Sequence, residues 1–134
     1  MVQALSKRTR MMFRLIILLL LMEACSLTSI DDSIDLGSQY RYIQDKPQVI
    51  IHHETDEYQG GGVNAVPPQV LSYAFNDRFI VAKSLHLDDA GNQIGSEPLY
   101  WIIDKESTDS QIASMDSTHF YNQLDKLRID LILN

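Results

Sequence analysis

Two adjacent histidines followed by acidic residues form the part of the sequence most similar to a metal site. His52, His53 and Glu54 are consecutive, and Asp56 and Glu57 follow closely. Imidazole nitrogens and carboxylate oxygens are common protein ligands of zinc and similar ions. On a strand, however, His52 and His53 point to opposite faces, and no HExxH or comparable second motif supplies further ligands. We therefore expect a solvated polar strand end here and no metal site.

Two loops resemble ion-binding loops in composition only. Asp88, Asp89 and Asn92 surround Gly91, as in an oxygen-rich calcium loop, but the twelve-residue EF-hand pattern and its closing glutamate are absent. The same residue types are those that a tight turn needs for its own backbone. The triple glycine at 60–62 lacks the Gly-Lys-Ser/Thr sequence of a phosphate-binding loop. We expect turns and flexible backbone in both places.

Nucleophilic catalysis has no support in the remaining motifs, because no Gly-x-Ser-x-Gly elbow is present to activate a serine. No spacing marks one histidine as a general base among His52, His53, His86 and His119. Six aromatic residues could include a binding patch, although sheet packing explains them more simply: Tyr40, Tyr42, Tyr58, Tyr73, Tyr100 and Trp101. We therefore expect no catalytic residues, no cofactor and no enzymatic activity.

The start of the chain has the three parts of a secretory signal. A basic segment precedes the apolar run 15–22, and the small residue Ala24 stands directly before Cys25. Eight apolar residues are well short of the roughly 20 that a membrane-spanning helix needs. The basic residues are Lys7, Arg8, Arg10 and Arg14. We expect residues 1–24 to be a signal peptide, with Met1, Met11 or Met12 as the translation start.

The sole cysteine follows a sequence that resembles a lipobox, the site at which bacterial lipoprotein precursors are cut and lipidated. Met22-Glu23-Ala24-Cys25 matches this motif at Met22, Ala24 and Cys25, whereas Glu23 replaces the usual small or apolar residue. The resemblance implies lipidation of Cys25 and anchoring at the membrane through acyl chains, each buried methylene contributing about 0.8 kcal/mol. The alternatives are a cysteine within an ordinary signal peptide that is cut elsewhere, and a short membrane or core helix.

The acidic balance excludes several kinds of partner. The formal net charge is −7, and removal of residues 1–24 takes away four basic residues and one acidic residue, so that the remaining 110 residues have a charge of −10. Such a domain is repelled by nucleic acid and by anionic lipid. With Cys25 acylated, the domain also contains no free thiol, so it requires neither an oxidising compartment nor redox chemistry.

Hydropathy patterns predict one small domain at residues 36–134, preceded by a tether at 25–35. Alternation predicts strands at 39–43 and 49–52 with a turn between them, whereas 60–62 and Pro67-Pro68 are expected in a single loop.

Two apolar runs, at 70–75 and 78–83, are expected to form a hairpin around a two-residue turn, Asn76-Asp77. This register pairs Phe75 with Arg78, Tyr73 with Ile80 and Leu71 with Ala82. It predicts a core face of Leu71, Tyr73, Phe75, Ile80 and Ala82.

The strand is expected to continue through Leu85 and Leu87, and a further strand at 99–104 completes a meander. Asp116, Ser117 and Thr118 are candidate N-caps for a helix whose apolar stripe is Phe120, Leu124 and Leu127. A last strand is predicted at 128–133. The expected fold class is α+β, a mostly antiparallel sheet of about five to six strands with one C-terminal helix packed on it.

Three stretches together with the lipobox-like start resemble small uncharacterised bacterial lipoproteins classed as a domain of unknown function: Val66–Tyr73, Arg78–Lys83 and Tyr100–Lys105. The resemblance covers roughly residues 36–134. It implies an envelope location and a compact α+β domain, and it carries over no catalytic residues.

We therefore expect a lipid-anchored, non-catalytic binding or accessory module of the bacterial cell envelope, on the outer membrane in a Gram-negative cell. Its partners would be the membrane, through the anchor, and a protein of the envelope, but not nucleic acid. Two alternatives stay open. One is a small metal-dependent envelope enzyme that uses His52, His53 or Glu54, and the other is an inhibitor or immunity-type protein with an acidic binding surface.

Overall fold

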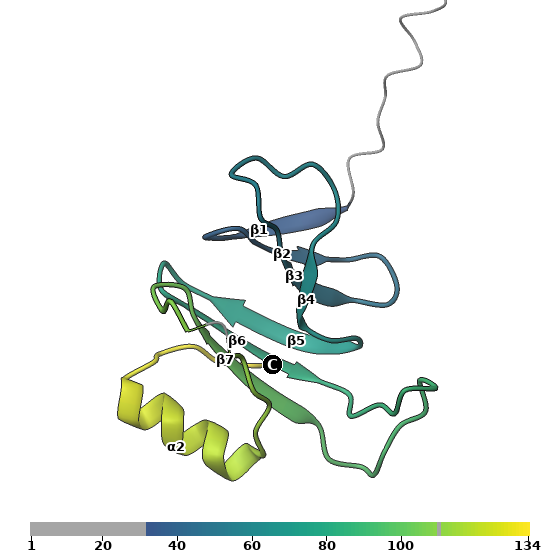
Figure 1. The fold of residues 1–134 in the computed structure, drawn as a ribbon. Coiled ribbons are helices and arrows are strands. Elements are labelled where there is room, and N and C mark those ends of the chain that lie inside the picture. Colours follow the sequence, from purple (N-terminus) through teal and green to yellow (C-terminus); the bar gives the residue numbers. More distant parts are fainter. Residues whose placement is uncertain (1–31, 110) are drawn as a thin grey trace, which may run out of the picture. The chain divides into compact units, whose positions relative to one another are not determined.

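The computed structural model describes residues 32–109 and 111–134. In this part, seven strands form two antiparallel sheets, ordered β1-β2-β3-β4 and β5-β6-β7, and one helix follows them (Figure 1). The expected α+β class with antiparallel strands and a C-terminal helix is confirmed, although the strands divide between two sheets. The elements are β1 (Ser33–Gly37), β2 (Tyr40–Ile43), β3 (Val49–His52), β4 (Val63–Val66), β5 (Val70–Phe75), β6 (Phe79–Ser84), β7 (Leu99–Asp104) and α2 (Ser117–Leu127).

The four-stranded sheet contains the expected hairpin of β2 and β3, in which Tyr42 pairs with Ile50. Its two outer strands were not expected. β1 includes residues 33–35, which the sequence assigned to the tether, and β4 lies inside the segment predicted as one loop. Gly62 allows β4 to begin beside β3, since a Cβ at this position would lie only 2.7 Å from the backbone oxygen of His52.

The hairpin of β5 and β6 forms with a longer turn than predicted. Phe75 pairs with Ile80 instead of Arg78, and Asn76 Oδ1 accepts hydrogen bonds from the backbone nitrogens of Arg78 (2.9 Å) and Phe79 (2.7 Å). Since this register differs from the prediction by two residues, the side chains of the regular part of the ladder, from Ser72 onward, keep their predicted faces.

The predicted core face of this hairpin is correct for Ile80 and Ala82, which are fully buried, and Tyr73 packs beside them. The ladder is irregular between Val70 and Ser72. At this irregularity Val70 is buried, while Leu71, predicted as core, is 46% exposed. Phe75, at the open end of the hairpin, is 42% exposed.

The β5–β7 sheet is covered on both faces. Ile80, Trp101 and Ile103 form one core cluster together with residues of the four-stranded sheet, among them Ile50. Phe79 and Val81, which alternate with Ile80, pack on the other side against Phe120 and Leu124 of α2. The β5–β7 sheet is therefore a middle layer, with the helix on one side and the four-stranded sheet on the other (Figure 1). Burial on both faces explains why β6 and β7 read as nearly continuous apolar runs.

Asp116, one of the three candidate N-caps, caps the helix and accepts a hydrogen bond from the backbone nitrogen of His119 (2.8 Å). The helix ends at Arg128, whose backbone is left-handed with φ of 54°. The strand predicted at 128–133 is wrong, because these residues join no sheet. Their alternation has another cause, which is that Ile129, Leu131 and Leu133 pack against the core on the helix side.

β6 ends at Ser84, so the predicted extension of this strand through Leu85 and Leu87 is also incorrect; Leu87 forms only an isolated bridge with Gln93. Cys25 and the predicted signal peptide lie outside the described residues. Between positions 32 and 134, with residue 110 left aside, the structure has no helix that is both long and apolar enough to cross a bilayer.

Candidate functional site

A groove of about 630 Å³ lies where α2 meets the β5–β7 sheet, and we call it the helix groove. Its volume falls within the range of about 300–1,000 Å³ that is common for ligand sites. Its apolar lining residues are Phe79, Ile102, Met115 and Leu127, and its polar ones are Asp104, Ser114, Asp116, His119 and Gln123.

Three elements position these side chains. Alternation along β7 places Ile102 and Asp104 on the helix side of the sheet. Met115 forms two backbone hydrogen bonds with Tyr100, of 2.9 and 3.0 Å, which hold the segment before the helix at the edge of β7. Asp116 then begins the helix, so that His119 lies one turn further along the groove.

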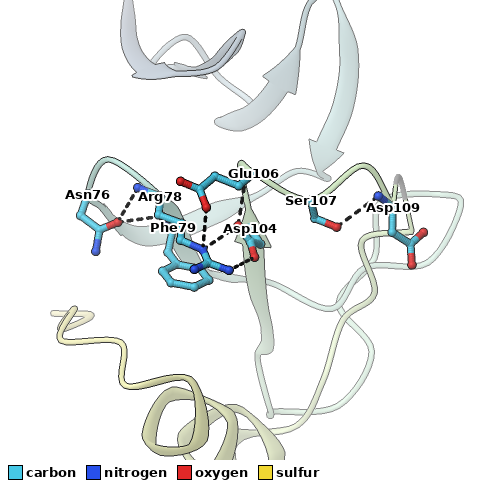
Figure 2. Close-up of polar contacts among 7 residues, drawn as sticks. All are labelled: Asn76, Arg78, Phe79, Asp104, Glu106, Ser107 and Asp109. Atoms are coloured by element: carbon cyan, nitrogen blue, oxygen red, sulfur yellow. Dashed lines mark hydrogen bonds and ion pairs between the residues drawn. The ribbon is translucent and has the colours of Figure 1, made fainter.

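Arg78 binds the carboxylate of Asp104 at one end of the helix groove (Figure 2). Its Nε and Nη2 atoms donate hydrogen bonds of 3.2 and 2.9 Å to Asp104, and Nε also lies 3.4 Å from Glu106 Oε2. The hydrogen bond from Arg78 lowers the pKa of Asp104, and the same contact raises the pKa of Arg78. Asp104 therefore stays ionised at neutral pH and holds the β5–β6 turn against the end of β7.

Asp116 and His119 form a second polar pair in the groove. Asp116 Oδ2 lies 2.9 Å from His119 Nδ1, and the hydrogen bond from the His119 backbone nitrogen is the largest cause of the lowered pKa of Asp116. When Nδ1 carries the proton that bridges to the carboxylate, Nε2 is left as an acceptor. The sequence contained the signal for this pair, an aspartate N-cap three residues before a histidine, but the spacing of the histidines alone did not single out His119.

The Asp116–His119 pair orients an imidazole that can act as a general base, but nucleophilic catalysis by a side chain has a further requirement. Nucleophilic catalysis needs a hydroxyl or thiol hydrogen-bonded to the base. Within the described ranges, the ring of His119 makes hydrogen bonds to Asp116 only. The groove thus offers apolar surface and two charged carboxylates, which are features of a binding site.

The histidines of the predicted polar strand end lie apart from each other. The ring of His52 contacts Tyr40 at a centroid distance of 4.6 Å. His53 is buried, which corrects the expectation of a solvated position, and its Nδ1 lies 2.7 Å from the backbone oxygen of Thr55. In the part of the chain that the structure describes, no three histidine, cysteine or acidic side chains lie close enough together to hold a metal ion.

The acidic loop around Gly91 uses its carboxylate for its own backbone. Asp88 Oδ1 accepts hydrogen bonds from the backbone nitrogens of Ala90 (3.0 Å) and Asn92 (2.8 Å). The bond from Asn92 is the largest cause of the lowered pKa of Asp88. These contacts support the prediction of a turn. At the triple glycine, Gly60 and Gly61 have φ of 87° and 86°, a backbone region that glycine adopts readily.

The aromatic residues do not gather into one patch. Tyr42 and Tyr73 contact each other at 4.3 Å and pack on the core between the two sheets. Tyr100 instead packs on Phe120 on the helix side. Trp101 is buried and donates a hydrogen bond of 2.9 Å to Ser84 Oγ. Most of these rings therefore contribute to packing, as the sequence suggested.

Comparison with known proteins gives a family match over most of the chain. A family described as a protein of unknown function (DUF3997) matches residues 37–134, which are 98 of the 134 residues. No curated protein and no solved structure matches the chain.

Proposed function

Because the chain belongs to the DUF3997 family, whose function is unknown, we propose from its own residues that it is a lipid-anchored, non-catalytic binding module of the bacterial cell envelope. The observation that carries the anchor is the single cysteine, which stands at the end of a basic and apolar signal-like segment. β1 begins at Ser33, eight residues after Cys25. Eight residues extend to at most about 29 Å, so acylated Cys25 would keep the domain close to the membrane surface.

The helix groove supports the binding part of the proposal. It combines an apolar lining with Asp104 and Asp116, which keep their negative charges because Arg78 and His119 donate hydrogen bonds to them. Such a mixture of apolar surface and a few fixed polar groups is typical of ligand sites.

Labelling of cells with an alkyne-tagged fatty acid tests the anchor. The wild-type chain should incorporate the label and sediment with membranes, because Cys25 is the only thiol available for acylation. Cys25→Ser should lose both properties, while the neighbouring Ser26→Ala, the matched control, should keep them. Label retained by the Cys25→Ser chain, or an intact full-length protein free in the cytosol, would exclude lipid anchoring at this residue.

Zinc tests the alternative of a metal-dependent enzyme. A metal that binds only the folded chain raises the melting temperature with increasing occupancy. We expect no rise on addition of zinc, either for the wild type or for His52→Ala. A rise that His52→Ala abolishes would support the enzyme and contradict the proposal of a non-catalytic module.

A further inference from the structure

We propose that the helix groove binds a basic, amphipathic segment of a protein partner. Apolar side chains of this segment would contact Phe79, Ile102 and Leu127, and a lysine or arginine would lie beside Asp104 and Asp116. The inference rests on the proposed binding function and specifies the chemistry of its partner.

The apolar part of the argument is the incomplete cover of the groove. Leu127 completes the predicted apolar stripe of the helix, yet its side chain is 44% exposed, whereas Phe120 and Leu124 on the same stripe are buried. Phe79 and Ile102 line the groove from the sheet. Removal of an exposed leucine side chain from water is favourable. A partner that covers Leu127 would therefore gain affinity that the isolated domain leaves unused.

The charge of the groove indicates that the partner carries basic side chains beside its apolar ones. Asp104 and Asp116 line it, whereas no lysine or arginine does. Arg78, which pairs with Asp104, is shared with Glu106, so two carboxylates there face one guanidinium. Both lining carboxylates have lowered pKa values and are ionised at neutral pH. Opposite charge on the partner therefore favours association and its rate.

The net charge of the described residues also favours a basic partner. The described residues contain 16 aspartates and glutamates against 7 lysines and arginines. This balance favours a basic partner and disfavours the surface of anionic lipid.

A fluorescent peptide of ten alternating leucine and lysine residues provides the probe. Its anisotropy is measured with the full chain in phosphatidylcholine nanodiscs, and empty discs give the blank. We expect saturable binding that weakens as salt is raised, because salt screens exposed charges. Peptides that alternate leucine with glutamate, or serine with lysine, should bind at least about tenfold more weakly, which is a difference of about 1.4 kcal/mol.

Two pairs of variants locate the binding site. Leu127→Lys should weaken binding of the leucine–lysine peptide about tenfold. Val63→Lys also replaces an exposed apolar residue by lysine, on β4 and outside the groove, where Val63 is 68% exposed, and it should have no effect. Asp116→Asn should keep the helix cap, since asparagine caps as well as aspartate, but weaken binding about threefold through loss of the charge. Asp45→Asn, in an exposed turn, is its control.

Three results would overturn the inference. They are equal weakening by Leu127→Lys and Val63→Lys, equal binding of the leucine–glutamate peptide, and no binding at all. Binding of the chain to phosphatidylglycerol vesicles that depends on Leu127 would assign the groove to lipid and overturn it as well. The fatty acid experiment is independent of these outcomes. Absence of label from the wild-type chain together with intact peptide binding would refute the anchor alone, whereas labelling of the wild-type chain at Cys25 without peptide binding would refute this inference alone.

Discussion

The two faces of the β5–β7 sheet differ in how completely they are covered, and adjacent residues of β7 show it. Ile103 is fully buried against the four-stranded sheet, whereas Ile102 is partly buried on the side of the groove. One helix of 11 residues, about 16 Å long, covers this second side together with apolar side chains of the C-terminal segment, among them Ile129. Both faces carry apolar side chains, so the difference comes from the covering layer and not from the strand. The part of this face that the helix and the C-terminal segment leave uncovered becomes the candidate site.

Replacement of Ile103 and of Ile102 by alanine should give the largest difference in stability between the two faces. Ile103→Ala removes a fully buried side chain and should lower the free energy of unfolding by about 2–5 kcal/mol. Ile102→Ala should cost less than half as much, because its surroundings include the open groove. Urea unfolding followed by circular dichroism measures both values. Equal losses would show that the helix side is as tightly packed as the other side.

The buried hydrogen bond between Trp101 and Ser84 should produce the next largest effect, on the enclosed side. Trp101→Phe removes the donor to Ser84 Oγ and should lower the free energy of unfolding by about 1–3 kcal/mol. In the double variant with Ser84→Ala, the loss should be smaller than the sum of the two single losses, because neither polar partner is then left alone. If the loss in the double variant equals the sum of the two single losses, Trp101 and Ser84 do not form this hydrogen bond.

Lys105 continues the enclosed side one residue beyond β7. Its Nζ atom donates hydrogen bonds of 2.6 Å to the backbone oxygens of Leu36 in β1 and Asn76 in the β5–β6 turn, and burial lowers its pKa. Lys105→Met keeps most of the apolar stem and should lower the free energy of unfolding by about 1 kcal/mol. Lys46→Met, in an exposed turn, should leave it unchanged. Matching effects of the two variants would deny Lys105 a role in joining the sheets.

Asp104 should give the smallest effect, visible mainly in acid. Because Arg78 lowers its pKa in the folded chain, the unfolded chain takes up the proton first as the pH falls. Its contribution to stability is therefore present above the unfolded value near 4 and is lost as the pH falls through the folded pKa. Asp104→Asn should flatten the decline of melting temperature below pH 4. A decline as steep as in the wild type would contradict the pairing with Arg78.

Local signals in the sequence were sufficient for much of the fold. The hairpin of β2 and β3, the meander of β5 to β7 and the cap at Asp116 were all predicted, because alternation and capping involve residues close together in the chain. β1 and β4 were missed, since β1 continues a polar segment and β4 lies between the triple glycine and Pro67-Pro68, and each becomes a strand only through pairing with a neighbour. The predicted strand at 128–133 failed for the opposite reason: alternation records which side chains are buried and not whether the backbone pairs.

Less of the candidate site than of the fold could be predicted from the sequence, because part of the site forms only in the tertiary structure. Asp116 and His119 are three residues apart, so their contact could be predicted from the sequence at the start of the helix. Arg78 and Asp104 are 26 residues apart, and only the pairing of β6 with β7 brings them together.

The amino-acid sequence by itself determined the acidic charge, the apolar runs, the helix start and the signal-like segment before Cys25. Each of these depends on composition or on neighbours in the chain. The tertiary structure decided which apolar face was sealed and which was left as a groove, because this depends on the size of the layer that packs against it.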